Sequence, residues 1–405
     1  PQFPEAHYNL ALVMEARGDF ISAERCYREA LSYRPDYLYA INNLSVLLVE
    51  SGRLGSAEKL LRKGLSSHGG SAELLTSFGT CLRNRGELNE ATEAYRKAIA
   101  IKPEFSEAIW NLALVDLAKG RFKEGWINYL HRPTVDRALY PIPNKIFGTD
   151  LTHRSFHIYG EQGLGDELFF MRFLPLLANR GCSMIYEPNP LIKEICMRAI
   201  SGYQVSGMSV EGEKIALPDL PYLLNIDAPQ PTLRVRPLDI SLKIARASLA
   251  DAGPPPYIGF TYRAGLQQPG SLFKEVPLIE FGNSLSAVNG TLINLQRSPQ
   301  NGESEILEDA LGRSVADFSI FNDNLEAMLA LMDILDDYVG VSNTNMHLRA
   351  LVSKPARVLI THPAEYRWMA FGKSPWFPDF RLYRQSPTGS WDKALQNLSN
   401  DLAKI

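Results

Sequence analysis

The sequence lacks the marks of several common protein classes. It has four cysteines in 405 residues, with no CxxC pair and no cysteine–histidine spacing typical of zinc, which excludes a disulfide framework and favours a reducing cytoplasm. No run of five or six like charges occurs and the net charge is −3, so the basic footprint of a nucleic-acid-binding protein is absent. The lack of an apolar stretch of about 18 residues, and of an amino-terminal signal pattern, predicts neither a membrane span nor export.

Several motifs of cofactor and metal chemistry are also missing. The sequence contains no GxGxxG fingerprint, no P-loop, no HExxH and no DxD motif. We therefore expect no bound cofactor and no metal site.

What the sequence does have is the composition of a folded protein with more than one domain. The apolar fraction is 45% and the charged fraction 21%, which is typical of globular proteins. Its length exceeds the usual domain size of about 100 to 200 residues, which predicts two or three domains. The chain begins at Pro1, inside a repeat, so we expect it to be a piece of a longer protein.

A repeat with a period of 34 residues runs through the first third of the chain. Gly18, Gly52, Gly86 and Gly120 follow one another at this interval. The same period relates three further positions, which hold Leu10, Leu44, Phe78 and Leu112, then Ala23, Ala57, Ala91 and Gly125, then Tyr27, Leu61, Tyr95 and Tyr129. This pattern predicts helix hairpins with glycine in the turn, small residues where the helices cross and large residues in the seam.

The spacing and residue types resemble the tetratricopeptide repeat. We predict units near 4–37, 38–71 and 72–105 and a fourth from 106, so that residues 1–130 form a helical solenoid with a concave surface.

A ladder of polar residues precedes the large apolar position of each unit. It holds Asn9, Asn43, Ser77 and Asn111. Asparagine at this position is common in such repeats and can bond neighbouring backbone. The ladder also looks like that of the O-linked N-acetylglucosamine transferases, in which side-chain amides hold an acceptor peptide. An amide suits that task because it donates and accepts hydrogen bonds.

After a proline-containing linker at 131–152, strands and helices alternate. Strands are predicted at 155–159, 183–187, 257–262, 291–296, 315–320, 337–342 and 356–360. Helices are predicted at 167–181, 190–200, 277–288, 303–311, 324–335 and 345–353. This alternation predicts parallel sheets in two Rossmann-like, doubly wound α/β lobes, at 153–237 and 238–405, with a ligand cleft at the carboxyl ends of the strands.

The sharpest local motif is the turn GEQGLGD at 160–166, between a predicted strand and a predicted helix. With the following residues to 181 it resembles the corresponding segment of repeat-fused glycosyltransferases related to the lipopolysaccharide heptosyltransferases. Further matching segments follow in order at 215–224, 257–265, 291–297, 317–351, 364–369 and 374–385.

This resemblance implies a GT-B fold with a nucleotide-sugar held mainly by the second lobe and an acceptor approaching the first. Asp166 matches the family's catalytic base, and a carboxylate suits the removal of a proton from an acceptor hydroxyl. An aspartate beside a helix start is also an ordinary cap. Gly163 and Gly165 would let the backbone approach the donor.

The segment SNTNMHLRAL at 342–351 matches a donor-binding segment of the same family. The resemblance assigns Asn343, Thr344, Asn345 and His347 to the nucleotide-sugar, near its phosphates, although a lone histidine is more often structural. Asn343 stands where the family has an aspartate, which bears on donor choice and on activity.

Four further residues on matched segments are expected to face the nucleotide-sugar. They are Arg263, Lys274, Gln296 and Arg297. The cations could offset the charge of the leaving nucleotide, or they could be solvated surface residues.

The resulting hypothesis is a metal-independent, inverting glycosyltransferase that modifies a hydroxyl of a protein held by the repeats. Flagellin-modifying transferases of bacteria share this plan, so flagellin or another surface protein is an expected acceptor. The alternatives are an enzyme acting on lipopolysaccharide or another glycan, and a non-catalytic repeat scaffold whose transferase module has decayed.

Overall fold

The computed structural model describes residues 3–142, 151, 154–201, 212–264 and 274–405. The chain forms two compact units, Pro1–Pro133 and Thr134–Ile405. The boundary falls inside the predicted linker, of which residues 143–150 and 152 lie outside the described residues.

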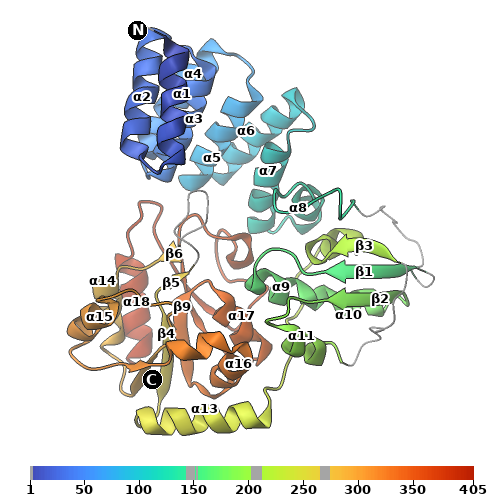
Figure 1. The fold of residues 1–405 in the computed structure, drawn as a ribbon, viewed down its shortest axis with the longest axis vertical. Helices are drawn as coiled ribbons and strands as arrows, with labels where there is room; N and C mark the ends of the chain where they lie inside the picture. Colours follow the sequence, from blue (N-terminus) through green and yellow to red (C-terminus); the bar gives the residue numbers. More distant parts are fainter. Residues whose placement is uncertain (1–2, 143–150, 152–153, 202–211, 265–273) are drawn as a thin grey trace. The chain divides into compact units, whose positions relative to one another are not determined.

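The first unit is built from helix hairpins (Figure 1). Its described helices are α1 (Pro4–Ala16), α2 (Phe20–Tyr33), α3 (Leu38–Glu50), α4 (Leu54–Ser67), α5 (Ala72–Asn84), α6 (Leu88–Ile101), α7 (Ser106–Ala118) and α8 (Phe122–Tyr129). Each helix packs on the next, and α3, α5 and α7 also pack side by side. The predicted helical solenoid is confirmed.

The repeated residues lie where the 34-residue pattern predicts. Each of the four repeated glycines lies in the turn within a hairpin and has a φ between +73° and +82°, where glycine is favoured because it has no Cβ. Ala23, Ala57 and Ala91 are fully buried, as are Tyr27 and Tyr95. The turn of each hairpin thus depends on the backbone conformation of its glycine. The close crossing of the two helices depends on small side chains.

The turn glycines allow a test in which packing does not interfere. A Cβ built on Gly52 meets no described atom within 4 Å, so Gly52→Ala should destabilise the protein through its φ of +73° alone, by about 1 to 2 kcal/mol. Gly55, in the first turn of α4, is the matched control because its Cβ also meets open space and its φ is not positive. Gly55→Ala should leave stability unchanged or raise it. Urea unfolding of the full chain gives both values, and equal effects would refute the explanation by backbone strain.

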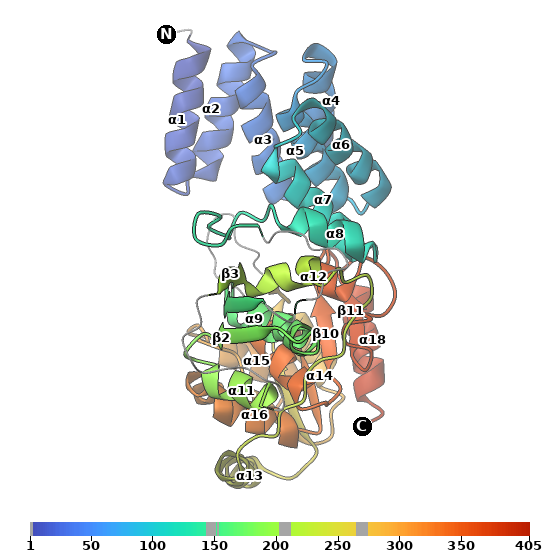
Figure 2. The same cartoon turned by 90° about the vertical axis from the view of Figure 1, so that its right-hand side faces the viewer.

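The second unit contains a small parallel sheet (Figure 2). Its strands are β1 (Ser155–Tyr159), β2 (Ser183–Glu187) and β3 (Glu213–Ala216), in the order β2-β1-β3. The helices of this region are α9 (Leu164–Phe170), α10 (Leu174–Ala178), α11 (Lys193–Ala199) and α12 (Leu220–Leu223). Phe156 and Ile158 of the central strand are buried, so the sheet has its own apolar centre.

The larger sheet of this unit is also parallel throughout its described pairings. Its strands are β4 (Tyr257–Thr261), β7 (Thr291–Asn294), β8 (Ala316–Asp317), β9 (Asp337–Val341), β10 (Arg357–Ile360) and β11 (Arg381–Arg384). Their order, β11-β10-β9-β4-β7-β8, is the doubly wound order in which the first and fourth strands of the sheet are neighbours. The predicted α/β region with parallel sheets is confirmed.

Helices cover both faces of the larger sheet. They are α13 (Asp239–Ala252), α14 (Leu278–Leu285), α15 (Glu303–Leu311), α16 (Leu325–Ile334), α17 (Thr344–Leu351) and α18 (Asp392–Leu402). One core joins β4, β7, β9 and β10 to α14, α15 and α18, with Phe281, Leu307 and Leu398 among its buried residues. On the other side α16 packs against α13 and α17, and α17 packs against α9. A short antiparallel hairpin, β5 (Arg263–Ala264) with β6 (Lys274–Glu275), follows β4.

One predicted helix was wrong in its extent. The segment 167–181 contains α9, a 3-10 turn at Met171–Phe173 and α10, not one helix. Pro175 explains the break, because its ring conflicts with the carbonyl four residues earlier, that of Met171, and it has no N–H to donate. The predicted strand at 315–320 is shorter than expected and pairs only at Ala316–Asp317.

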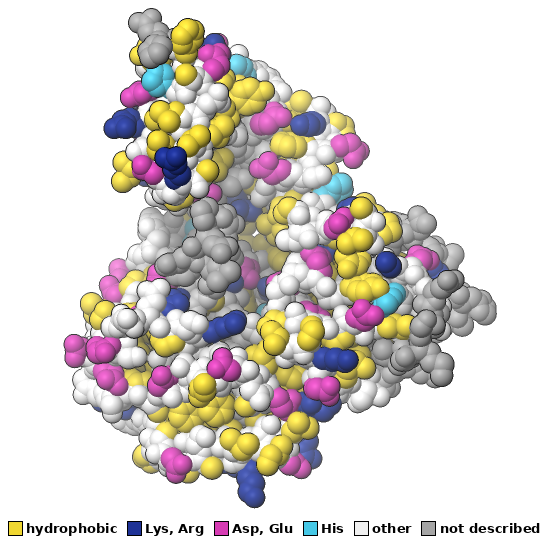
Figure 3. Space-filling model, in the orientation of Figure 1, with side chains coloured by type: hydrophobic (Ala, Val, Ile, Leu, Met, Phe, Trp, Pro, Cys, Tyr) yellow, Lys and Arg dark blue, Asp and Glu magenta, His cyan; other side chains and the backbone are white. Residues whose placement is uncertain are grey.

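The surface carries mixed charge. On the face drawn in Figure 3, acidic and basic side chains are interspersed in each unit. Among the helices that the structure describes, none combines the length and the apolar character needed to cross a membrane.

Candidate functional site

The candidate site lies where β4 and β9 run side by side in the middle of the larger sheet. From these two strands the chain continues to opposite sides of the sheet, to β7 and to β10. In doubly wound sheets such a switch point is where ligands bind, outside the carboxyl ends of the strands. Arg263 follows β4 and Asn343 follows β9, so the sheet brings two of the predicted donor-site segments together.

Asn343 has a structural task at this point. Its side-chain oxygen accepts a hydrogen bond from the Met346 N–H at 3.2 Å and so caps α17, while its amide nitrogen donates to the Thr261 hydroxyl at 2.9 Å. A carboxylate can only accept, so an aspartate here would need the Thr261 hydroxyl to donate to it, whereas the amide donates to that hydroxyl. The Asn343 amide ties the end of β9 to the end of β4. Thr344 begins α17, and Asn345 is buried in its first turn.

His347 lies inside the protein, where α17 packs on α9. Its side chain is 3% exposed, and its ring centroid lies 6.3 Å from that of Phe169 and 5.6 Å from that of Phe377. A Cβ on Gly165 would approach His347 Cδ2 to 3.0 Å, so glycine is what lets α9 come this close. Burial, with smaller contributions from Arg172 and Lys274, lowers the pKa of His347 to about 3. The imidazole is therefore neutral at physiological pH.

This histidine should make stability depend on pH. Because its folded pKa is depressed, the unfolded chain binds a proton below about pH 6.5 that the folded chain does not, and stability falls as the pH drops through that window. At pH 5 the loss relative to pH 7.5 is about 2 kcal/mol. His347→Gln should lack this component. Urea midpoints of both proteins at the two pH values measure it, and parallel pH dependences would contradict the assignment.

Asp166 lies in the first turn of α9 and pairs with Arg367. Among the residues that the structure describes, no side chain caps α9, so the carboxylate is used for this ion pair and not for capping. Arg367 also bonds Glu365, at 3.1 Å, and Glu365 pairs with Lys274. Lys274 donates to the Ser342 carbonyl, just beyond β9, at 3.1 Å. A chain of alternating charges thus connects Asp166 to the carboxyl edge of the larger sheet.

The remaining predicted donor-site residues have different surroundings. Arg263 is bound in two places by Glu303, at 3.0 and 2.9 Å, and hydrogen bonding to Glu303 raises its pKa. Gln296 accepts from the backbone N–H groups of Tyr262 and Arg263 at 3.1 and 3.0 Å, which holds the end of β4 in place. Arg297 is exposed. Of the predicted cations, Lys274 is therefore the one that the described ion pairs connect to Asp166.

The sequence analysis missed Glu167. Its buried carboxylate accepts from the Tyr186 hydroxyl at 2.7 Å and from the Asn189 N–H at 2.9 Å, and burial raises its pKa. A Cβ on Gly160 would lie 2.4 Å from one of its oxygens. Glu167 therefore fastens the turn that carries Asp166, and Gly160 makes room for it. The neighbouring acidic residues Asp166 and Glu167 at the start of the predicted helix were the feature of the sequence that could have pointed to Glu167.

Arg172 was missed as well. It is 3% exposed, its guanidinium carbon lies 4.2 Å from the ring centroid of Phe169, and burial lowers its pKa to about 9. It donates to the carbonyls of Phe169, Gln230 and Trp376 at 2.8, 3.0 and 3.3 Å and to the Thr232 hydroxyl at 3.1 Å. One side chain thus joins α9, the segment before α13 and the segment after β10. No single stretch of sequence indicates such a role.

The predicted asparagine ladder lies on α1, α3 and α7, the first helices of their hairpins. Asn9 is exposed. Asn43 donates to the hydroxyls of Tyr8 and Tyr27 at 3.3 and 3.4 Å. Asn111 donates to the Glu107 carbonyl at 3.0 Å and accepts from Arg83 at 3.1 Å. Two of the three amides therefore bond neighbouring groups inside the array, as asparagines at this position of such repeats commonly do.

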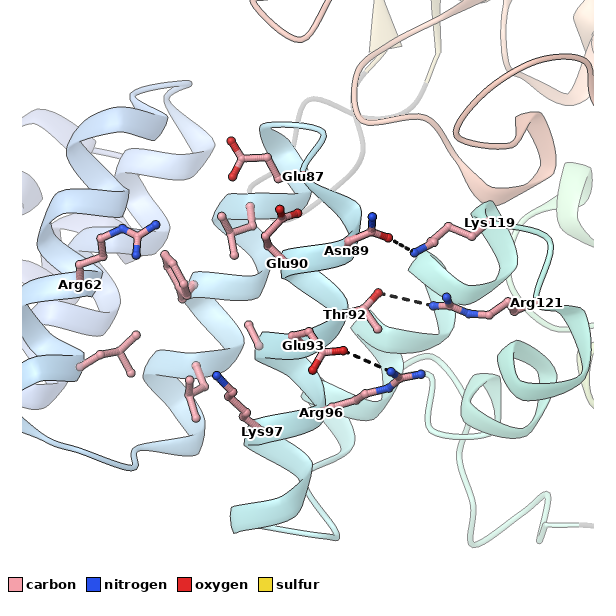
Figure 4. A pocket seen from close by; sticks show the side chains of 15 residues that line it. Arg62, Glu87, Asn89, Glu90, Thr92, Glu93, Arg96, Lys97, Lys119 and Arg121 are labelled. Carbon is pink, nitrogen blue, oxygen red and sulfur yellow. Dashed lines mark hydrogen bonds and ion pairs between the residues drawn. The ribbon is translucent and has the colours of Figure 1, made fainter.

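A groove of about 670 Å³ lies elsewhere in the repeats, between α4 and α6 (Figure 4). Leu75, Phe78 and Leu82 of α5 contribute apolar lining. Figure 4 shows charged side chains around it, with Arg62 on one side and Lys119 and Arg121 on the other. The described residues that line this groove include none of the asparagine ladder. Apolar lining with charges of both signs suits an amphipathic peptide segment.

The fold defines a tetratricopeptide array followed by an α/β unit with parallel sheets. Residues 4–37 match the family described as tetratricopeptide repeat, and residues 79–120 match TPR repeat. These repeats indicate a protein-binding scaffold.

Known proteins resemble the chain at a distance. Protein FlbA of Caulobacter vibrioides is 23% identical over 334 residues, which cover 72% of this chain and 54% of FlbA. The chain therefore spans about half the length of that curated relative. A solved structure of MamA protein is 23% identical with a TM-score of 0.29, covering 32% of this chain and 70% of that one. The pilF protein of Pseudomonas aeruginosa is 26% identical with a TM-score of 0.30, covering 31% and 58%.

Proposed function

We propose that this protein is a glycosyltransferase that moves a sugar from a nucleotide-sugar to a hydroxyl of a protein held by the repeats. The observation that carries the proposal is the position of Asp166, whose carboxylate meets Arg367 beyond the carboxyl ends of β9 and β10. Doubly wound sheets bind nucleotides at this edge, and a carboxylate is a suitable general base for an acceptor hydroxyl.

In this proposal the nucleotide-sugar lies at the switch point between β4 and β9. The backbone N–H groups at the start of α17 and the cation Lys274 favour its phosphates. The reaction is inverting, because one carboxylate removes the acceptor proton while the sugar carbon is attacked directly. The likeness of residues 160–181 and 342–351 to heptosyltransferase-like enzymes supports a nucleotide-sugar as the donor. The proposed reaction needs no metal ion.

The acceptor in this proposal is a protein, because the repeats form a protein-binding scaffold. Flagellin or another surface protein is the acceptor that the resemblance favours. The groove between α4 and α6 is a second surface on the repeats that could hold such an acceptor.

A donor screen tests the proposal. The full chain is incubated with UDP-, GDP-, ADP- and CMP-sugars, with thermal shifts read for the matching nucleotides and slow donor hydrolysis followed in parallel. A ligand that binds only the folded state raises the melting temperature, by an amount that grows with ligand concentration. Stabilisation by one nucleotide together with sugar release from its donor is the expected result. If no nucleotide stabilises the protein and no donor is hydrolysed, the proposed transferase activity is wrong and only the protein-binding scaffold is left. The use of Asn343 as a helix cap is compatible with that result as well.

A further inference from the structure

Arg367 is held in a fixed orientation at the candidate site. Its guanidinium carbon lies 5.0 Å from the ring centroid of Phe169 and 5.1 Å from that of Tyr366, and its side chain is 8% exposed. Rings at this distance favour a cation. From this position the guanidinium meets two carboxylates, Asp166 and Glu365. A planar guanidinium presents its N–H groups in a rigid fork, which suits carboxylate and phosphate equally.

The two carboxylates are not held equally. Glu365 pairs with both Arg367 and Lys274, and 15% of its side chain is exposed. Asp166 is 28% exposed and approaches Arg367 from α9, on the small-sheet side. When an anion enters, the more accessible carboxylate is the one that it can displace. An incoming phosphate would therefore compete with Asp166 for Arg367, while Glu365 keeps its second cation.

We propose that Arg367 is shared between Asp166 and a phosphate of the donor, so that donor binding releases the catalytic base. This inference rests on the proposed function. An arginine partner stabilises the charged form of a carboxylate and makes it a weaker base, so Asp166 is held inactive while the site is empty. Transfer of Arg367 to the phosphate removes that restraint and couples activation of the base to the presence of donor.

The chemical step then proceeds with Arg367 on the donor. Asp166 takes the proton of the acceptor hydroxyl, and the hydroxyl oxygen bonds to the anomeric carbon. The bond from that carbon to the phosphate oxygen breaks, and its electron pair stays on the phosphate of the departing nucleotide. Arg367 contacts that leaving group, where negative charge develops.

A double-mutant cycle on ligand binding tests the shared arginine. Calorimetric titration uses whichever of ADP, UDP, GDP and CMP gives the largest thermal shift. Asp166→Asn should bind it about 3- to 10-fold more tightly, because a competitor for Arg367 is removed, and Arg367→Gln should bind it about tenfold or more weakly. In the Arg367→Gln background, Asp166→Asn should leave the affinity for the nucleotide unchanged. Arg236→Gln and Asp239→Asn, an exposed ion pair at 2.8 Å, are the matched control cycle and should not alter affinity.

Each outcome separates the two hypotheses. If none of ADP, UDP, GDP and CMP binds wild type, the proposed function fails and this inference fails with it. If one binds, but Asp166→Asn weakens binding or acts equally in both backgrounds, the sharing of Arg367 is wrong and the proposed function stands. Should Arg367→Gln fail to fold, Arg367→Lys replaces it in the same cycle, with weaker binding expected and the same loss of the Asp166 effect.

Discussion

Asp166→Asn should abolish sugar transfer while nucleotide binding is not weakened. A general base contributes about 10²- to 10⁴-fold to the rate, because it takes a proton only in the transition state. An asparagine keeps the shape of the side chain but cannot accept that proton at neutral pH. Transfer to an acceptor protein, followed by mass spectrometry, and calorimetric titration of the nucleotide measure the two quantities separately.

The control for this variant is Asp239→Asn, since Asp239 is an exposed aspartate at the start of α13. It should transfer sugar at the wild-type rate. Full activity of Asp166→Asn would exclude Asp166 as the base. Loss of activity together with a lowered melting temperature would instead indicate a structural role for its ion pair with Arg367.

Arg172→Ala should strongly destabilise the folded protein. It removes the donor of four hydrogen bonds, two of which, to the carbonyls of Phe169 and Trp376, are buried. A buried acceptor that loses its partner costs about 1 to 3 kcal/mol, and the bonds are coupled, so a total of about 3 to 5 kcal/mol is expected. Chemical unfolding followed by tryptophan fluorescence reports on this region, because Trp376 contacts Arg172.

Arg236→Ala is the matched control, because that arginine is mostly exposed and its pair with Asp239 lies on the surface. Exposed pairs contribute about 0 to 1 kcal/mol. An effect of Arg172→Ala no larger than that of the control would show that water replaces the lost bonds and that Arg172 does not hold the α/β unit together.

The solenoid could be predicted because its determinants are local. Glycine at a positive φ, alanine at a helix crossing and a large residue in the seam recur every 34 residues, and each acts within its own hairpin. The strands at 155–159 and 183–187 were equally predictable, as short apolar runs bounded by turns. The helix at 392–402 was missed although Leu395, Leu398 and Leu402 follow helical spacing and are buried in the core.

Local spacing and matched segments were enough to predict the repeats, the parallel α/β alternation and Asp166 as a candidate. Which charges meet depends instead on the folded chain. Asp166 and Arg367 are about 200 residues apart in the sequence, as are Arg172 and Trp376, and no periodicity connects them. The burial that makes His347 neutral and the ion pair that commits Arg263 to Glu303 arise from packing between elements, so the sequence neighbours of these side chains could not predict their availability.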